Sequence, residues 1–255
     1  MTKTIDLNFD GGEGCDDAAL MPHVTTVNVA CGAHAGDAAT MRATVRLAAE
    51  SGVAIFAHPS YPDREAFGRR RMTLPPAEVE QLVREQVSAL AAVAREEGVA
   101  LSGVKPHGGL YHAVASEEAI ARALVSAARA VDPRLILVTS PGSRLIAAAR
   151  GLGMRAAAEG FADRGYDAVG SIVSRGTAGA LVETAEQAAA QALSLARDGF
   201  AIAVDGTRVL LAVETICLHG DTPGAAANAA AVRRALEEAG FELRALAGYQ
   251  IRSTS

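Results

Sequence analysis

Apolar runs of four to six residues alternate with amphipathic stretches along the whole chain. The apolar runs predict strands at 4–9, 25–30, 53–57, 99–104, 135–138, 155–158, 200–204, 209–213 (extending toward Leu218) and 241–246. The stretches with helical spacing predict helices at 37–50, 76–97, 143–149, 184–197 and 225–239, and a further helix capped by Ser116. Strands that alternate with helices in this way form a parallel sheet with crossover helices.

The placement of polar residues favours a barrel over an open sheet. About seven strand–helix units follow one another without a linker, which predicts a single domain over residues 1–255. Polar residues follow several of the strands, and a β/α barrel collects such residues on one face. An open doubly wound sheet would concentrate them at one switch point. The chain also has no G-x-G-x-x-G motif that opens a helix.

Composition indicates which kinds of partner and which cellular compartment to expect. The chain has 255 residues, 50% of them hydrophobic, with a net charge of −5 and no long basic run, which argues against nucleic acid. No apolar run is long enough to cross a bilayer and no apolar leader opens the chain, so we expect no membrane partner. Three cysteines without C-x-x-C spacing indicate reduced thiols, and we expect a cytoplasmic protein.

Residues 103–112, Gly-Val-Lys-Pro-His-Gly-Gly-Leu-Tyr-His, combine several reactive groups. The apolar run before them ends at Pro106, so Lys105, His107 and Tyr111 stand at the carboxyl end of a strand. The two glycines at 108 and 109 allow a sharp turn or a close approach to a ligand. A cation, an imidazole and a phenol in seven residues indicate a site, since functional residues concentrate on loops held by a rigid scaffold.

The same arrangement of strand, polar residue and small residue recurs along the chain. The other groups that follow strands are Asp6/Asn8/Asp10/Glu13, Asn28/His34/Asp37, His58/Asp63, Glu159/Asp163/Arg164 and His219/Asp221. Any one group could cap a helix, but six at the same relative place predict a shared pocket. We expect that pocket to be lined by Asp10, His34, His58, Lys105, Glu159 and His219.

The kind of chemistry is left open by these spacings. Asp and His from separate strands can hold a divalent ion, but no H-E-x-x-H is present, so a protein-bound metal stays undecided. Cys31 lies near His34 and Cys217 near His219, which makes a thiol nucleophile a minor alternative, because free cysteines usually pack as small hydrophobes. No P-loop occurs, so any nucleotide binds by other means.

These motifs, in order over nearly the whole chain, resemble the LamB/YcsF family, which includes the A subunit of bacterial 5-oxoprolinase. The matching segments are 6–13, 28–37, 57–63, 67–70, 104–111, 161–164 and 216–223. The chain departs from the usual family motifs at Phe9, Gly109, His112 and Ser174. His112, at the end of the lysine motif, is the departure that could alter the rim of a substrate site.

The resemblance implies an irregular seven-stranded β/α barrel, similar to the glycoside hydrolase/deacetylase superfamily. It also implies ATP-dependent hydrolysis of 5-oxo-L-proline to L-glutamate, with ATP and Mg²⁺ as cofactors and the B and C subunits as partners. Two alternatives are a metal-dependent deacetylase-like hydrolase and a non-catalytic subunit that presents substrate to its partners.

Phosphorylation of the lactam oxygen would make it a leaving group, so the site needs cations for the phosphate and a base for water. The catalytic candidates are Asp10, Glu13, Lys105 and His107. The candidates for binding substrate or phosphate are Asn8, Asn28, His34, Asp37, His58, Arg69, Arg70, Tyr111, Asp163, Arg164, His219 and Asp221.

Overall fold

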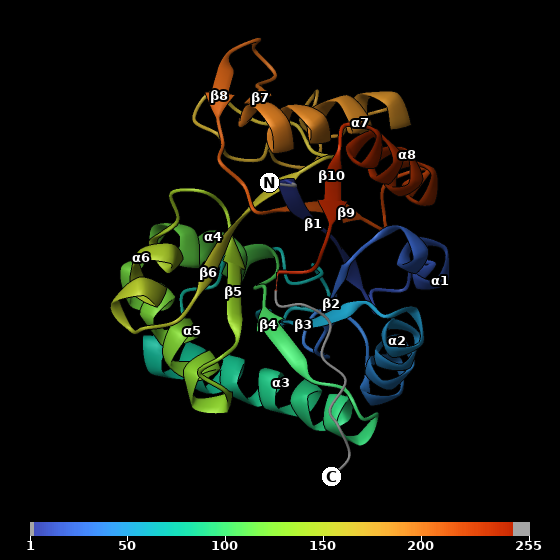
Figure 1. Ribbon diagram of the computed structural model, residues 1–255. Helices are drawn as coiled ribbons and strands as arrows, with labels where there is room; N and C mark the ends of the chain where they lie inside the picture. Colours follow the sequence, from blue (N-terminus) through green and yellow to red (C-terminus); the bar gives the residue numbers. More distant parts are fainter. Residues whose placement is uncertain (1–2, 247–255) are drawn as a thin grey trace.

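The computed structural model describes residues 3–246, which form a closed barrel of parallel strands surrounded by helices (Figure 1). The barrel strands are β1 (Lys3–Gly11), β2 (Thr26–Ala30), β3 (Ala54–His58), β4 (Leu101–Val104), β5 (Ile136–Thr139), β6 (Ala156–Phe161) and β9 (Thr215–His219). β1 pairs with both β2 and β9, which closes the sheet on itself. The predicted seven-stranded β/α barrel is therefore confirmed.

Helices cover the outside of the barrel in the order in which the chain enters them. The helices are α1 (Asp17–Leu20), α2 (Ala38–Ser51), α3 (Pro76–Glu96), α4 (Gly108–Ser116), α5 (Glu118–Val131), α6 (Arg144–Gly151), α7 (Ala185–Leu193) and α8 (Ala225–Glu238). Asp37 caps α2 through a hydrogen bond from the Thr40 N–H, and Gly52 ends it with φ +68°, as the sequence predicts. The short α1 and the 3₁₀ turn η1 (Met21–His23) were not predicted.

The segment after Lys105 differs from the prediction. Gly108 and Gly109 begin helix α4 instead of forming an isolated turn. They are needed for close packing, because a Cβ at Gly109 would lie 2.3 Å from the Arg70 carbonyl oxygen. Ser116, predicted to cap the next helix, is the last residue of α4, and its hydroxyl donates to the His112 carbonyl.

A small antiparallel hairpin lies outside the barrel, where two barrel-like strands were predicted. It consists of β7 (Phe200–Ile202) and β8 (Arg208–Leu210), and Figure 1 shows it at the edge of the molecule. The strand predicted to run from 209 toward Leu218 is therefore wrong, because the chain breaks between β8 and β9. Asp205 and Gly206, with φ +88° at the glycine, form the turn, and Asp-Gly is a strong hairpin signal. The last strand, β10 (Phe241–Leu243), adds to the start of β1.

The two faces of β1 explain how the barrel is filled. Side chains alternate along a strand, so Leu7 and Phe9 lie on the face opposite Asp6, Asn8 and Asp10. Leu7 and Phe9 belong to the apolar core under the helices. The three polar residues are buried and hydrogen-bond to side chains of other barrel strands. The interior of the barrel is therefore a polar column that leads toward the carboxyl ends of the strands.

Candidate active site

A pocket of about 330 Å³ opens at the carboxyl ends of the barrel strands. This volume is at the small end of the range for ligand pockets, so it suits a small molecule. The strand-end loops contribute charged, imidazole and phenol groups in a small space. The main lining residues are Asp10, Glu13, His58, Arg69, Lys105, His107, Tyr111, His112, Phe161, Arg164, Arg175 and His219.

Lys105 is a buried cation at the junction of the pocket and the polar column. Its Nζ lies 2.9 Å from Asp10 Oδ1 and 2.8 Å from Glu159 Oε1, and it is 3.0 Å from Cys217 Sγ. Burial opposes its charged form, but Asp10 and the other anionic neighbours hold the pKa of Lys105 well above its usual range. Burial would raise the pKa of Asp10, yet His58 and Lys105 hold it well below its usual range. Both groups are therefore charged at neutral pH.

Two asparagines below the pocket hold these charges in place. Asn28 Nδ2 donates to Asn8 Oδ1 at 2.7 Å and to Asp10 Oδ1 at 2.9 Å. Asn8 Nδ2 in turn donates to Glu159 Oε1 at 3.1 Å. Asn8 and Asn28 are buried inside the barrel, so they position the charged groups and do not line the pocket.

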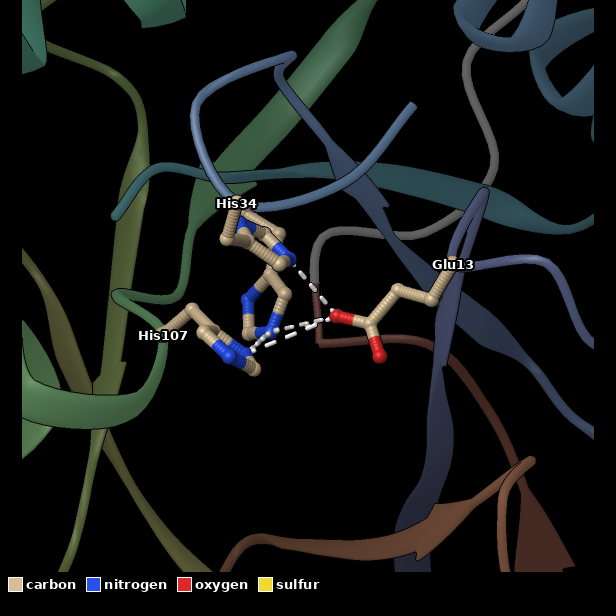
Figure 2. Close-up of side chains that lie close together, drawn as sticks. Glu13, His34 and His107 are labelled. Atoms are coloured by element: carbon tan, nitrogen blue, oxygen red, sulfur yellow. Dashed lines mark hydrogen bonds and ion pairs between the residues drawn. The ribbon is translucent and has the colours of Figure 1, made fainter. Parts of the chain in front are cut away.

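Glu13, His58 and His107 line one wall of the pocket, and His34 lies behind Glu13. We call these four residues the histidine cluster, of which Figure 2 labels Glu13, His34 and His107. Glu13 Oε1 lies 2.8 Å from His34 Nε2, 3.5 Å from His107 Nδ1 and 3.8 Å from His58 Nε2. The rings of His34 and His107 stack with centroids 3.9 Å apart. Burial and the neighbouring His58 lower the pKa of His34 to about 3 and that of His107 well below its usual range. His34 and His107 are therefore neutral imidazoles at physiological pH.

His219, at the end of β9, and Asp163, just after β6, form an oriented pair. His219 Nδ1 donates to Asp163 Oδ1 at 2.9 Å, and the His219 backbone N–H donates to Asp163 Oδ2 at 2.8 Å. Burial works against the imidazolium, but the Asp163 carboxylate gives His219 a raised pKa. His219 Nε2 points the other way, 4.0 Å from Asp10 Oδ2, so this nitrogen faces the pocket.

Three guanidinium groups stand at the mouth of the pocket. Asp221 accepts from Arg69 at 3.1 Å and from Arg175 at 3.0 Å, which ties two separate loops together. Arg164 is buried and donates to the carbonyls of Ala180 and Val173. The mouth therefore carries more positive than negative charge and suits an anionic ligand.

The chain matches one protein family over nearly its whole length. The family model described as the LamB/YcsF family covers residues 5–250. The chain belongs to the LamB/YcsF family. It is 49% identical to the 5-oxoprolinase A subunit of Chloroflexus aggregans over 94% of this chain and 98% of that protein. It is 46% identical to the 5-oxoprolinase A subunit of Pyrococcus furiosus over 94% of this chain and 96% of that protein.

Solved structures agree with this assignment. The lactam utilization protein from Thermus thermophilus superposes with a TM-score of 0.89 at 40% identity, over 95% of this chain and all of that one. A family 4 carbohydrate esterase from Streptomyces lividans superposes with a TM-score of 0.53 at 12% identity, over 98% of this chain and 97% of that one. The second likeness concerns the fold alone. Within residues 3–246, no helix of this LamB/YcsF chain has the length and apolar character needed to span a membrane.

The six residues predicted to line one pocket do gather at one end of the barrel of this LamB/YcsF protein. Four of them, Asp10, His58, Lys105 and His219, line the pocket. The other two lie one contact behind its wall, because Glu13 covers His34 and Lys105 covers Glu159.

Two predicted binding residues lie farther out. Asp37 is exposed and its carboxylate caps α2. Arg70 binds Asp63 with two hydrogen bonds of 2.9 and 2.6 Å and does not line the pocket. In both cases a partner nearby in the sequence holds the side chain. The geometry therefore gives each a structural contact in place of the predicted ligand contact.

The sequence pattern did not identify the roles of two further residues at the site. Arg175 lines the pocket from a long loop that carries no strand-end signal. Cys217 lies against Lys105, where it was considered only as a minor nucleophile. Burial raises the pKa of Cys217 well above its usual range and that of Cys31 to about 12. Both are protonated thiols, which leaves no support for a cysteine nucleophile.

Proposed function

We propose that this chain is the A subunit of an ATP-dependent 5-oxoprolinase and that its pocket binds 5-oxo-L-proline. Near-half identity over almost the whole length to proteins named as 5-oxoprolinase A subunits carries the proposal. The B and C subunits are the proposed partners, and ATP with Mg²⁺ is the proposed phosphoryl donor. The product is L-glutamate.

The chemistry explains the need for ATP. A lactam carbonyl is stabilised by amide resonance, and transfer of a phosphoryl group to its oxygen makes that oxygen a leaving group. Water then adds to the carbon, and the ring C–N bond breaks as the nitrogen takes up a proton, which leaves an acyl phosphate. A second water hydrolyses this acyl phosphate, so that phosphate departs and the side-chain carboxylate of glutamate forms. Negative charge develops on oxygen during these steps, and the fixed Lys105 ammonium is placed to stabilise it.

The mouth and wall of the pocket suit the substrate's polar groups. Arg69, Arg164 and Arg175 offer guanidinium groups for a carboxylate or a phosphate. The buried Tyr111 hydroxyl lines the pocket and has no hydrogen-bond partner among residues 3–246. A buried hydroxyl without a partner is unfavourable, so a ligand that supplies this hydrogen bond gains affinity.

His219 is the group that we assign to proton transfer. Asp10, one of the catalytic candidates from the sequence, is a weak base, because His58 and Lys105 keep its pKa low. The Asp163 carboxylate fixes the His219 tautomer so that Nε2 is free to accept a proton from water. Asp163 also gives this imidazole a raised pKa, which makes it a stronger base.

The test is a combined measurement of ADP and glutamate. The lone chain, with or without ATP, should release almost no glutamate from 5-oxoproline, since each ~1.4 kcal/mol of missing barrier reduction lowers the rate tenfold. Addition of the B and C subunits should restore glutamate release in about one-to-one proportion with ADP.

Two other outcomes would favour the alternatives. Metal-stimulated hydrolysis by the lone chain, indifferent to ATP, would indicate a deacetylase-like hydrolase. Full turnover by a complex that carries His219→Gln and Lys105→Ala together would indicate a subunit that only presents the substrate.

A further inference from the structure

Backbone carbonyls outside the histidine cluster determine which ring nitrogen carries the proton in two of its imidazoles. His58 Nδ1 lies 2.7 Å from the Lys105 carbonyl oxygen, and His107 Nε2 lies 2.9 Å from the Phe67 carbonyl oxygen. A carbonyl only accepts, so these two nitrogens carry the ring protons. With one ring proton each, the two imidazoles leave His58 Nε2 and His107 Nδ1 as acceptors, whereas a second proton on His58 would let its Nε2 donate to His107 Nδ1 at 3.0 Å or to Asp10 Oδ2 at 3.4 Å.

The tautomer of His34 follows from its serine partner. His34 Nδ1 lies 2.9 Å from Ser60 Oγ, and the Ser60 hydroxyl donates its proton to the Tyr61 carbonyl at 2.9 Å. Ser60 Oγ therefore accepts from His34 Nδ1, and His34 Nε2 is a third acceptor.

All three acceptor nitrogens converge on a fourth acceptor, Glu13 Oε1, and Figure 2 shows the labelled rings of His34 and His107 turned toward this oxygen. The four atoms lie within 4.8 Å of one another. His34 Nε2 is 2.8 Å from Glu13 Oε1, and His107 Nδ1 is 3.0 Å from His58 Nε2. Lone pairs at these distances repel unless positive charge lies among them.

We propose that the histidine cluster binds one divalent transition-metal ion of the zinc class. Neutral imidazoles and a carboxylate are suitable ligands for such ions. Ligand atoms around a tetrahedral Zn²⁺ are ~3.3 Å apart, given bond lengths near 2.0–2.1 Å. Four of the six separations among these atoms are 2.8, 3.0, 3.5 and 3.8 Å and bracket that value, and all six are within 4.8 Å. The proposal concerns this cluster and does not depend on the reaction proposed above.

The contacts of the ring nitrogens that point away from Glu13 are those of a metal site. Ligating histidines usually donate their second N–H to a carbonyl or another acceptor, which fixes the tautomer and orients the ring. Here the acceptors are the carbonyls of Lys105 and Phe67 and the hydroxyl of Ser60. The competing arrangement places one extra proton on Glu13 and one on His58, with no ion bound.

The experiment compares ion uptake by the full chain and by matched variants. After treatment with a chelator, the protein is dialysed against Co²⁺ or Zn²⁺, and elemental analysis measures the bound ion. We expect one equivalent, and with Co²⁺ the intense visible absorption of a four-coordinate complex. His34→Gln should bind at least about a hundredfold more weakly, since loss of even an outer-shell partner weakens binding 10–100-fold. His23→Gln changes a histidine in η1, outside the cluster, and should bind as the unchanged chain does.

A second variant tests the tautomer argument. Ser60→Ala removes the acceptor that fixes His34 and should weaken Co²⁺ binding about tenfold. Zn²⁺ should raise the melting temperature of the unchanged chain and of His23→Gln, but not that of His34→Gln. If His34→Gln does not fold, Glu13→Gln replaces it. Equal ion uptake by the unchanged chain and the ligand variant would mean that protons alone occupy the cluster, and the proposal would be wrong.

Discussion

Lys105 compensates two buried carboxylates, and its side chain is only 2% exposed. We predict that Lys105→Ala destabilises the protein by about 3–5 kcal/mol, because Asp10 and Glu159 would be left buried without their cation. Turnover in the reconstituted system should also fall by about a hundredfold or more. Chemical denaturation measures the first effect, and glutamate release the second.

Lys3→Ala is the matched control for this prediction. Lys3 lies in the exposed first part of β1, so its loss should change the free energy of unfolding by less than about 0.5 kcal/mol. Equal stability of the two variants would show that Lys105 does not compensate these buried side chains.

The Asp163–His219 pair predicts a specific dependence on pH. The folded pKa of His219 is raised, so its contribution to stability is complete below its unfolded pKa of 6.5 and is lost as pH rises through the folded value. As a general base, His219 should give kcat/KM a limb that rises with pH. Asp163→Asn should move this limb to lower pH and reduce kcat/KM by at least about a hundredfold, because the tautomer is no longer fixed.

The pH profile of kcat/KM in the reconstituted system is the measurement. Asp198→Asn, which changes a carboxylate paired with Arg197 in the turn after α7, should leave the limb in place. An unshifted limb in Asp163→Asn would assign the titration to a residue other than His219.

At the scale of residues, the sequence shows which side chains stand at strand ends but not which partners hold them. Asp10, Lys105 and His219 follow apolar strands, and the structure brings them together. The orienting role of Asp163 depends on how the segment after β6 packs against the end of β9. The pairing of Arg70 with Asp63 depends on the fold of a single long loop. Neither contact leaves a pattern in the sequence.

At the scale of elements, strands and long helices were predicted well because apolar runs and end signals agree. Asp37 and Gly52 mark both ends of α2, and Pro76 opens α3. Prediction failed where the same residue type is compatible with two different local structures. Glycines at 108 and 109 indicate a turn, yet here they permit the first turn of α4 to pack against the 68–70 loop. The apolar run of β8 belongs to a hairpin, although its composition suits a barrel strand equally well.

Substitution of Asp37 tests whether this residue caps α2 or binds a ligand. Asp37→Ala removes the cap of α2 and should destabilise the protein by about 1 kcal/mol, as loss of a helix N-cap does. Thermal or chemical denaturation measures the change. Activity in the reconstituted system should stay within about twofold, because the side chain lies outside the pocket. A large loss of activity with unchanged stability would restore the sequence-based assignment of Asp37 to ligand binding.

At the scale of the whole molecule, the alternation of strands and helices predicts the barrel. The alternate polar positions of β1 predict which side chains face its interior. Asp6, Asn8 and Asp10 occupy alternate positions and form the polar column. The column is possible because strands from both halves of the chain supply its partners, among them Thr215 and Lys105. Those partners could not be assigned from the sequence, since they depend on how the strands are staggered around the barrel.

Closure of the barrel by β1 and β9 predicts the behaviour of truncated chains. A chain that stops at Gly199 lacks β9 and would leave Asp6 and Asn8 without Thr215. We expect this fragment to show no cooperative unfolding transition in calorimetry, whereas a chain that stops at Leu246 should unfold cooperatively. A cooperative transition in the shorter fragment would show that β1 to β6 form a stable sheet alone.

The pairing of β1 with β9 also has a consequence for the nascent chain during synthesis. About 10–40 s of synthesis separate the two strands at the usual rate of elongation, and β1 must wait for that time with one edge unpaired. A long apolar strand in this position would invite aggregation, and charged or polar residues protect against it. The same Asp6, Asn8 and Asp10 that shape the interior therefore also keep the first strand from joining other chains. The site is assembled only after His219 leaves the ribosome, so any partner that recognises the completed pocket must bind the finished chain.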